Sequence, residues 1–165
     1  MKNKVFIAIL VSLFAVAAVA AGVTYYNVSS RGTENAIVKI DKDGKADETV
    51  TVSELTLNPS ETKDDVIYLT CEADGEFDVS LEFIEKYDGG LKPFVTVKIT
   101  SAGNTVYDGT LAALLTDKAP VTFKSGVAKK GKTELVISYS MPESVGNEAK
   151  NTSSRFDIHV TVDKK

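Results

Sequence analysis

The chain has 165 residues, of which 43% are hydrophobic and 25% charged, and its formal net charge is -4. This length and composition are those of one globular domain with a single core, and they exclude wholesale disorder. An acidic balance without a long basic run argues against nucleic acid as a partner. The single cysteine, Cys71, excludes an intramolecular disulfide.

The first 21 residues predict an export signal peptide that forms a hydrophobic helix. Lys2 and Lys4 make a basic start, and an almost continuous apolar run covers residues 5–18. Small residues that suit the export signal peptidase end this segment: Ala18, Ala20 and Ala21. The alternative is an uncleaved membrane anchor, because the apolar stretch reaches about Val23 and approaches the roughly 20 residues that span a bilayer. Both interpretations predict that the rest of the chain is exported, as a secreted or cell-surface protein.

Residues 22–36 show little core-building pattern, and we expect them to be a flexible segment in the monomer. A short predicted strand follows, and the folded domain is expected to span residues 37–165. Residues 41–48 predict a charged turn. Their aspartates suggest a calcium loop, but an EF-hand loop with Gly44 at its sixth position would begin at Lys39, so the motif fails.

Residues 49–57 predict a strand with an irregularity in the middle. Val50 and Val52 alternate with threonines, and the apolar positions then shift phase to Leu55 and Leu57. A phase shift inside a strand indicates a β-bulge or a corner.

Residues 66–73 and 76–83 predict a β-hairpin. Both runs alternate apolar and polar residues, and Asp74-Gly75 between them suits a two-residue type I′ turn. On this phasing Cys71 is a small buried residue, and an intermolecular disulfide is the alternative.

Further short strands are predicted at residues 94–100, 105–108 and 120–124, and residues 110–115 predict a helical turn with Thr110 as its N-cap. Most glycines fall between these elements, in predicted turns. Many short strands at regular spacing indicate an all-β, antiparallel β-sandwich with one or two short helical turns.

The stretch from Thr133 to Val162 organises the predicted fold. It contains two strands with strict period-two alternation, separated by a stop at Pro142 and a turn at Gly146-Asn147. The apolar faces of these strands are expected to be the centre of the core: Leu135, Ile137, Tyr139, Met141, Phe156, Ile158, Val160 and Val162.

No catalytic constellation is visible in the sequence. It has no glycine-rich phosphate loop, no H-E-x-x-H zinc motif and no G-x-S-x-G elbow. His159 is the single histidine, and its phase places it on the solvent face of a strand beside Asp157 and Thr161. We therefore expect a protein that is not an enzyme, without a cofactor and without a metal site.

Two segments, VYDGTL (106–111) and ELVISYSMPESVGNEAKNTSSRFDIHVTV (134–162), resemble the TasA/camelysin family of exported bacterial proteins. The shared features are Asp108-Gly109 before a short helix, Met141-Pro142 ending a strand, the Gly146-Asn147 turn and the final strand at 156–162. The hydrophobic leader running into AAGVTYYNVSS also resembles the family's signal peptides.

The resemblance implies a jelly-roll sandwich that serves as a structural subunit of extracellular biofilm-matrix fibres. It further implies self-association into filaments, with other matrix proteins as further partners, through a donor strand that completes the sheet of the next subunit. Here the donor would span about residues 23–40, with apolar or aromatic candidate positions Val23, Tyr25, Val28, Ile37, Val38 and Ile40. The alternatives are a monomeric, membrane-tethered binding module and a camelysin-like metalloprotease, for which the chain shows no zinc motif.

Overall fold

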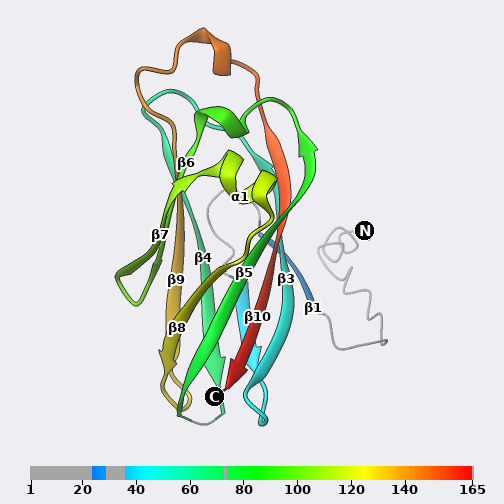
Figure 1. The fold of residues 1–165 in the computed structure, drawn as a ribbon, viewed down its shortest axis with the longest axis vertical. Helices are drawn as coiled ribbons and strands as arrows, with labels where there is room; N and C mark the ends of the chain where they lie inside the picture. The colour runs from blue at the N-terminus through cyan, green and yellow to red at the C-terminus, as the bar shows by residue number, and fades with distance from the viewer. Residues whose placement is uncertain (1–23, 29–35, 73, 165) are drawn as a thin grey trace, which may run out of the picture.

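The computed structural model describes residues 24–28, 36–72 and 74–164. In these residues the chain forms two β-sheets that run along the long axis of the molecule and enclose one hydrophobic core (Figure 1). The predicted all-β sandwich is confirmed. The predicted signal peptide, the cleavage residues Ala18, Ala20 and Ala21, and the candidate Val23 lie outside the described residues.

Each sheet has five strands among the described residues. The first sheet has the order β1 (Thr24–Val28), β3 (Lys45–Leu55), β10 (Ser154–Lys164), β5 (Gly75–Asp88) and β8 (Val121–Val127). The second sheet has the order β2 (Ala36–Ile40), β4 (Thr62–Cys71), β9 (Lys132–Ser140), β6 (Thr96–Ser101) and β7 (Asn104–Thr110). The strands β3 to β10 follow the eight-stranded jelly-roll order and pair antiparallel, which confirms the predicted jelly-roll-like architecture.

The strands β1 and β2 are additions to this jelly roll. Each extends one sheet by a parallel pairing, β1 with β3 and β2 with β4. The purely antiparallel sandwich expected from the sequence therefore has a parallel strand at one edge of each sheet.

The two alternating strands of the 133–162 stretch are the central strands of the sandwich. β9 occupies the middle of the second sheet and β10 the middle of the first. All eight predicted core residues on their apolar faces are buried, and the Tyr139 and Phe156 rings meet edge to face at 5.9 Å. Each central strand packs one face on the core, and successive side chains of a strand point to opposite faces, which gives both strands their alternation.

The predicted irregularity in residues 49–57 is a β-bulge in β3. Ser154 of β10 is opposite Leu55, whereas Phe156, two residues later, is opposite Val52, so β3 has one extra residue in this interval. The extra residue restores the inward direction of the apolar side chains, and Val50, Val52 and Leu55 are all fully buried.

The predicted hairpin over residues 66–83 is wrong. β4 and β5 are both strands, but they belong to different sheets, and Gly75 begins β5 directly after the crossing between the sheets. Asp74 holds this crossing through its Oδ1, which accepts a hydrogen bond from the backbone N–H of Lys129 at 2.6 Å. Both strands alternate because each has one face on the same core, and alternation alone does not say which strands pair.

The described residues also form three short helices: η1 (Lys92–Phe94), α1 (Leu111–Asp117) and η2 (Asn147–Ala149). The predicted N-cap is confirmed, because the Thr110 side chain accepts the Ala113 N–H at 3.1 Å. α1 packs against β5 and β7 with Leu111, Leu114 and Leu115 buried. No helix among the described residues is both long and apolar enough to span a membrane.

Candidate assembly edge

The strands β1 and β2, together with their neighbours β3 and β4, form one side of the sandwich, which we call the N-terminal edge. β2 lies against β3 of the opposite sheet as well as beside β4, so the edges of the two sheets meet here. Unpaired backbone groups at a sheet edge can accept a further strand. β1 is the outermost described strand of its sheet at the N-terminal edge, so its outer side presents such groups.

Part of the predicted donor segment forms β1, which pairs with β3 of the same chain. Tyr25 is opposite Thr49 and Val28 is opposite Val52 in a parallel register with β3. The flexible segment predicted at residues 22–36 contains an edge strand, Thr24–Val28, in the structure.

The strand β2 holds the other candidate donor residues inside the fold. Ile37, Val38 and Ile40 are opposite Tyr68, Leu69 and Cys71 of β4. Val38 and Ile40 are fully buried, as is Ala36 at the start of the strand. In this structure the apolar positions of β2 therefore belong to the subunit's own core. Sequence periodicity could not show this, because a donated strand and a native edge strand carry the same apolar pattern.

The Glu48 side chain links β2 to the opposite sheet. It is 7% exposed, and its Oε1 accepts a hydrogen bond from the backbone N–H of Lys39 at 3.3 Å. Burial raises the pKa of the Glu48 carboxyl, while the Lys39 N–H and the Lys39 charge lower it. The second oxygen, Oε2, is buried without a hydrogen-bond partner among the described residues.

A cavity of about 360 Å³ opens beside Glu48 at the beginning of β3. Its charged lining consists of four carboxylates and two amines: Asp41, Asp47, Glu48, Asp163, Lys39 and Lys45. The Asp41 carboxylate accepts the backbone N–H groups of Asp43 at 2.9 Å and Lys45 at 2.8 Å, which explains its place in the turn before β3. The predicted turn of residues 41–48 is shorter than expected, since β3 begins at Lys45.

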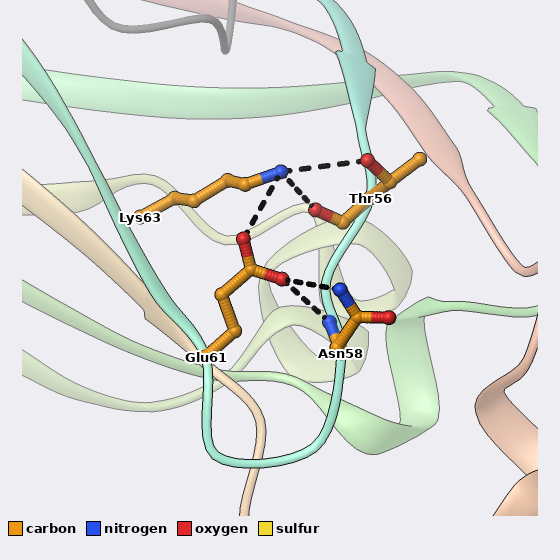
Figure 2. Close-up of polar contacts among 4 residues, drawn as sticks. All are labelled: Thr56, Asn58, Glu61 and Lys63. Atoms are coloured by element: carbon orange, nitrogen blue, oxygen red, sulfur yellow. Dashed lines mark hydrogen bonds and ion pairs between the residues drawn. The ribbon is translucent and has the colours of Figure 1, made fainter.

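The outer edge of β4 is only partly covered. β2 pairs with β4 from Ile67 onward, and no described strand pairs with the same edge at residues 62–66. Lys63 lies on this open part, where its Nζ contacts the carbonyl oxygen and hydroxyl of Thr56 and one oxygen of Glu61 (Figure 2). The other Glu61 oxygen accepts the backbone and side-chain N–H groups of Asn58 at 2.8 and 3.0 Å. A charged lysine at an open edge hinders unselective pairing with other chains.

Asp65 faces the core beside Tyr139 at the same part of β4. Asp65 is 5% exposed, and burial raises the pKa of its carboxyl to about 6, with the Tyr139 hydroxyl opposing the shift and the Asp64 charge adding to it. Asp65 Oδ2 and Tyr139 Oη are both buried without a partner in hydrogen-bond geometry among the described residues. Tyr139 was predicted in the core, but Asp65 was not. The signal available for Asp65 in the sequence was its place in the alternation with Ile67 and Leu69.

His159 is on the outer face of β10, as predicted. Its Nε2 lies 2.6 Å from Asp47 Oδ1, and its Nδ1 lies 3.8 Å from Glu82 Oε2.

Asp157 was expected on the same solvent face but is 9% exposed, because it pairs with Lys86 at 3.0 Å and accepts the Thr51 hydroxyl at 2.9 Å. Within the described part of the chain, no group of three or more His, Cys, Asp or Glu residues could hold a metal ion.

Cys71 ends β4 inside the fold. It is 7% exposed, and its Sγ lies 3.5 Å from the carbonyl oxygen of Val127 and 3.6 Å from that of Ala128. The predicted burial of this cysteine is confirmed.

The fold and this edge define a jelly-roll β-sandwich with two additional N-terminal edge strands. No protein-family model and no curated protein matches the chain.

The chain aligns with several solved structures at low TM-scores. The chain aligns over 81% of its length with a β-glucosidase from Paenibacillus barengoltzii, of which it covers 13%, at 10% identity and a TM-score of 0.35. It aligns over 78% of its length with the pre-peptidase C-terminal domain of a Bacillus anthracis collagenase, covering 97% of that chain at 14% identity and a TM-score of 0.34. It also aligns over 78% of its length with PliG of Aeromonas hydrophila, a periplasmic inhibitor of g-type lysozyme. It covers 99% of that chain at 9% identity and a TM-score of 0.35. Such scores carry no functional argument.

Proposed function

We propose that this chain is a secreted structural subunit of extracellular matrix fibres, similar to the TasA/camelysin family, and that it assembles head to tail by exchange of β1. The observation that carries the proposal is that β3 to β10 already make a jelly roll, to which β1 adds only an edge pairing with β3. The β1 strand of a neighbour can make the same parallel register, so exchange preserves the pairing and creates a contact between subunits.

The chain between β1 and β2 supplies the reach that exchange needs. Residues 29–35 connect the two strands, and at ~3.3–3.6 Å per residue an extended segment of that length spans about 25 Å. β2 stays with its own subunit because Val38 and Ile40 are buried and the Lys39 N–H is bound by Glu48. Donor and acceptor are then different surfaces of one subunit, so the contact is head to tail, and it propagates as a filament when the rotation between subunits does not close a ring.

A reversible disulfide between β1 and β3 tests the exchange. Asn27 and Thr51 are register partners, and neighbouring strands are ~4.8 Å apart, within the Cα range of a disulfide. We expect Asn27→Cys/Thr51→Cys, in a Cys71→Ala background, to form filaments when reduced and none when oxidised as a monomer. Oxidation after assembly should produce a ladder of covalently linked subunits on a denaturing gel.

The matched control places the cysteine pair where no exchange is proposed. Lys98 and Asp108 are register partners in β6 and β7 at the opposite side of the second sheet. Lys98→Cys/Asp108→Cys should form filaments in both redox states and give only monomers on the gel. Filaments from the oxidised Asn27/Thr51 monomer, or the absence of any filament from the exported wild-type chain, would contradict the proposal.

A further inference from the structure

Lys63 and Asp65 are neighbours on the inner face of β4, yet the Lys63 amine is bound elsewhere in the structure. Their register partners on β9 are Tyr139 and Ile137, which are both buried in the core. Alternate residues of a strand point to the same side and are roughly 6.6 Å apart. An extended lysine side chain covers this distance, so the Lys63 amine is within reach of the Asp65 carboxyl.

The Lys63 amine fastens the 56–61 loop, which joins β3 to β4 (Figure 2). Its Nζ contacts the carbonyl oxygen of Thr56 and lies 3.4 Å from the Thr56 hydroxyl and 3.6 Å from one oxygen of Glu61. The other Glu61 oxygen accepts the backbone and side-chain N–H groups of Asn58. Lys63 therefore holds the two ends of the loop together.

The Asp65 carboxyl lacks a donor for its ionised form. Asp65 is 5% exposed, and its Oδ2 and the Tyr139 hydroxyl are buried without a hydrogen-bond partner among the described residues. Burial raises the pKa of the Asp65 carboxyl to about 6, while the Tyr139 hydroxyl lowers it and the Asp64 charge raises it. From the end of β3, the apolar side chains of Leu55 and Leu57 are buried in the same core. Lys63 is the single basic residue of β4.

The two acceptors of the Lys63 amine differ in how they respond to pH. The Asn58 N–H holds the pKa of the Glu61 carboxyl below its usual range, so Glu61 stays ionised from pH 5 upward. Asp65 is largely neutral at pH 5 and ionised at pH 7.5. An exposed ion pair such as that of Lys63 with Glu61 contributes little, whereas a buried carboxylate without a partner is strongly unfavourable. Ionised Asp65 is therefore the stronger competitor for the amine.

We propose that Lys63 and Asp65 form a switch in which the Lys63 amine leaves Thr56 and Glu61 for the Asp65 carboxylate when Asp65 ionises, and the 56–61 loop is released. In acid the amine fastens the loop, as in the structure. At neutral pH this end of the sandwich is looser, beside the part of β4 whose outer edge no described strand covers. The switch requires neither β1 nor an assembled fibre, so it does not depend on the proposed function.

The test measures amide hydrogen exchange in the 56–61 loop of the exported chain by NMR, at pH 5 and pH 7.5. The reporters are the N–H groups of Ser60 and Glu61, which donate to Met141 and Asn58 carbonyl oxygens, each at 2.9 Å. Each rate is divided into the rate of an unstructured peptide at the same pH, which gives a protection factor.

The fastened state binds the Asp65 proton with a pKa of about 6, above the ordinary 3.8, so rising pH favours the released state. The linkage between pH 5 and pH 7.5 amounts to about tenfold, and we expect the two protection factors to fall by up to this factor. Val160, in the centre of the first sheet, should keep its protection.

Three variants separate the switch from a general loosening of the fold. Asp65→Asn keeps the size of the side chain and removes the charge, so the loop should be equally protected at both pH values. Lys63→Met removes the amine and should leave the loop poorly protected at both. Lys86→Met is the matched control, because it removes a lysine whose ion pair with Asp157 lies on another strand, and it should behave as wild type.

The ¹⁵Nζ resonance of Lys63 reports the partner of the amine directly. It should change between pH 5 and pH 7.5 in the wild-type chain and stay constant in Asp65→Asn. Equal loop protection at both pH values in wild type, or the same loss in Asp65→Asn, would overturn the proposal. A loss of protection without a change at the Lys63 resonance would overturn it as well, because the amine would then not have changed partners. If Lys63→Met does not fold, the comparison of wild type with Asp65→Asn decides.

Discussion

The Glu48 carboxylate in β3 accepts the backbone N–H of Lys39 in β2 at 3.3 Å, and this hydrogen bond joins the two sheets at the N-terminal edge. In the proposed assembly β1 leaves its subunit while β2 stays. The contact between Glu48 and Lys39 is one of the physical reasons for that difference, together with the burial of Val38 and Ile40.

Glu48→Ala should loosen β2 locally. The Lys39 N–H loses its acceptor, and one hydrogen bond to a charged group contributes about 1.5–3 kcal/mol. We expect amide exchange at Lys39 to become at least about fivefold faster by NMR, since ~1 kcal/mol of local opening free energy corresponds to that factor. Thr70→Val is the control, because it removes only the 3.4 Å contact between the Thr70 hydroxyl and the Val38 carbonyl. Equal exchange at Lys39 in Glu48→Ala and wild type would show that the carboxylate does not hold β2.

Asp65 should make the fold less stable as the pH rises. Its folded pKa of about 6 lies above the ordinary value of 3.8, so the unfolded chain releases this proton first. The contribution of Asp65 to the free energy of unfolding is therefore fully present below about pH 4 and is lost as the pH rises through 6, by up to about 3 kcal/mol.

Asp65→Asn should remove this pH dependence and increase the free energy of unfolding at pH 7.5, measured by urea denaturation. Glu143→Gln, which removes a carboxylate at an exposed position, is the control and should change the profile little. The pKa assigned to Asp65 would be contradicted if the free energies of unfolding of the wild-type chain and of Asp65→Asn changed equally between pH 4 and pH 7.5.

Gly44 should tolerate substitution less well than Gly103, although both have a positive φ, of 77° and 81°. A Cβ at Gly44 would lie 2.2 Å from the Cβ of Lys164, whereas a Cβ at Gly103 would meet nothing within 4 Å. We expect Gly103→Ala to cost about 1 kcal/mol for its backbone alone. Gly44→Ala should cost about 1–3 kcal/mol more, because overpacking displaces β10 from the turn. Equal unfolding midpoints for the two variants would show that the turn before β3 does not pack against Lys164.

His159→Ala should leave filament formation unchanged. The ring is on the outer face of β10, where it contacts Asp47 and Glu82, and β3 lies between β10 and β1 in the sheet. We also expect the exported wild-type chain to show no chelator-sensitive hydrolysis of casein. Proteolysis that disappears both with a chelator and in His159→Ala would instead favour the camelysin-like metalloprotease.

The amino-acid sequence by itself determined which residues face the core. Period-two alternation identified β9 and β10, the phase shift identified the bulge in β3, and Thr110 identified the start of α1. These features depend on neighbours along the chain, because side-chain direction in a strand and the capping of a helix are local properties.

Only the tertiary structure decided which strands are neighbours and what the N-terminal edge contains. The alternation of β4 and β5 is the same whether they pair in a hairpin or face each other across the core, and the core separates them into two sheets. Likewise, the apolar residues of β2 predict a strand, but they do not say whether this strand pairs with a sheet of its own chain or with one of a neighbouring subunit. The contact of Glu48 with Lys39 and the approach of Asp65 to Tyr139 join residues from different strands, so they follow from the packing of the two sheets and from no pattern along the chain.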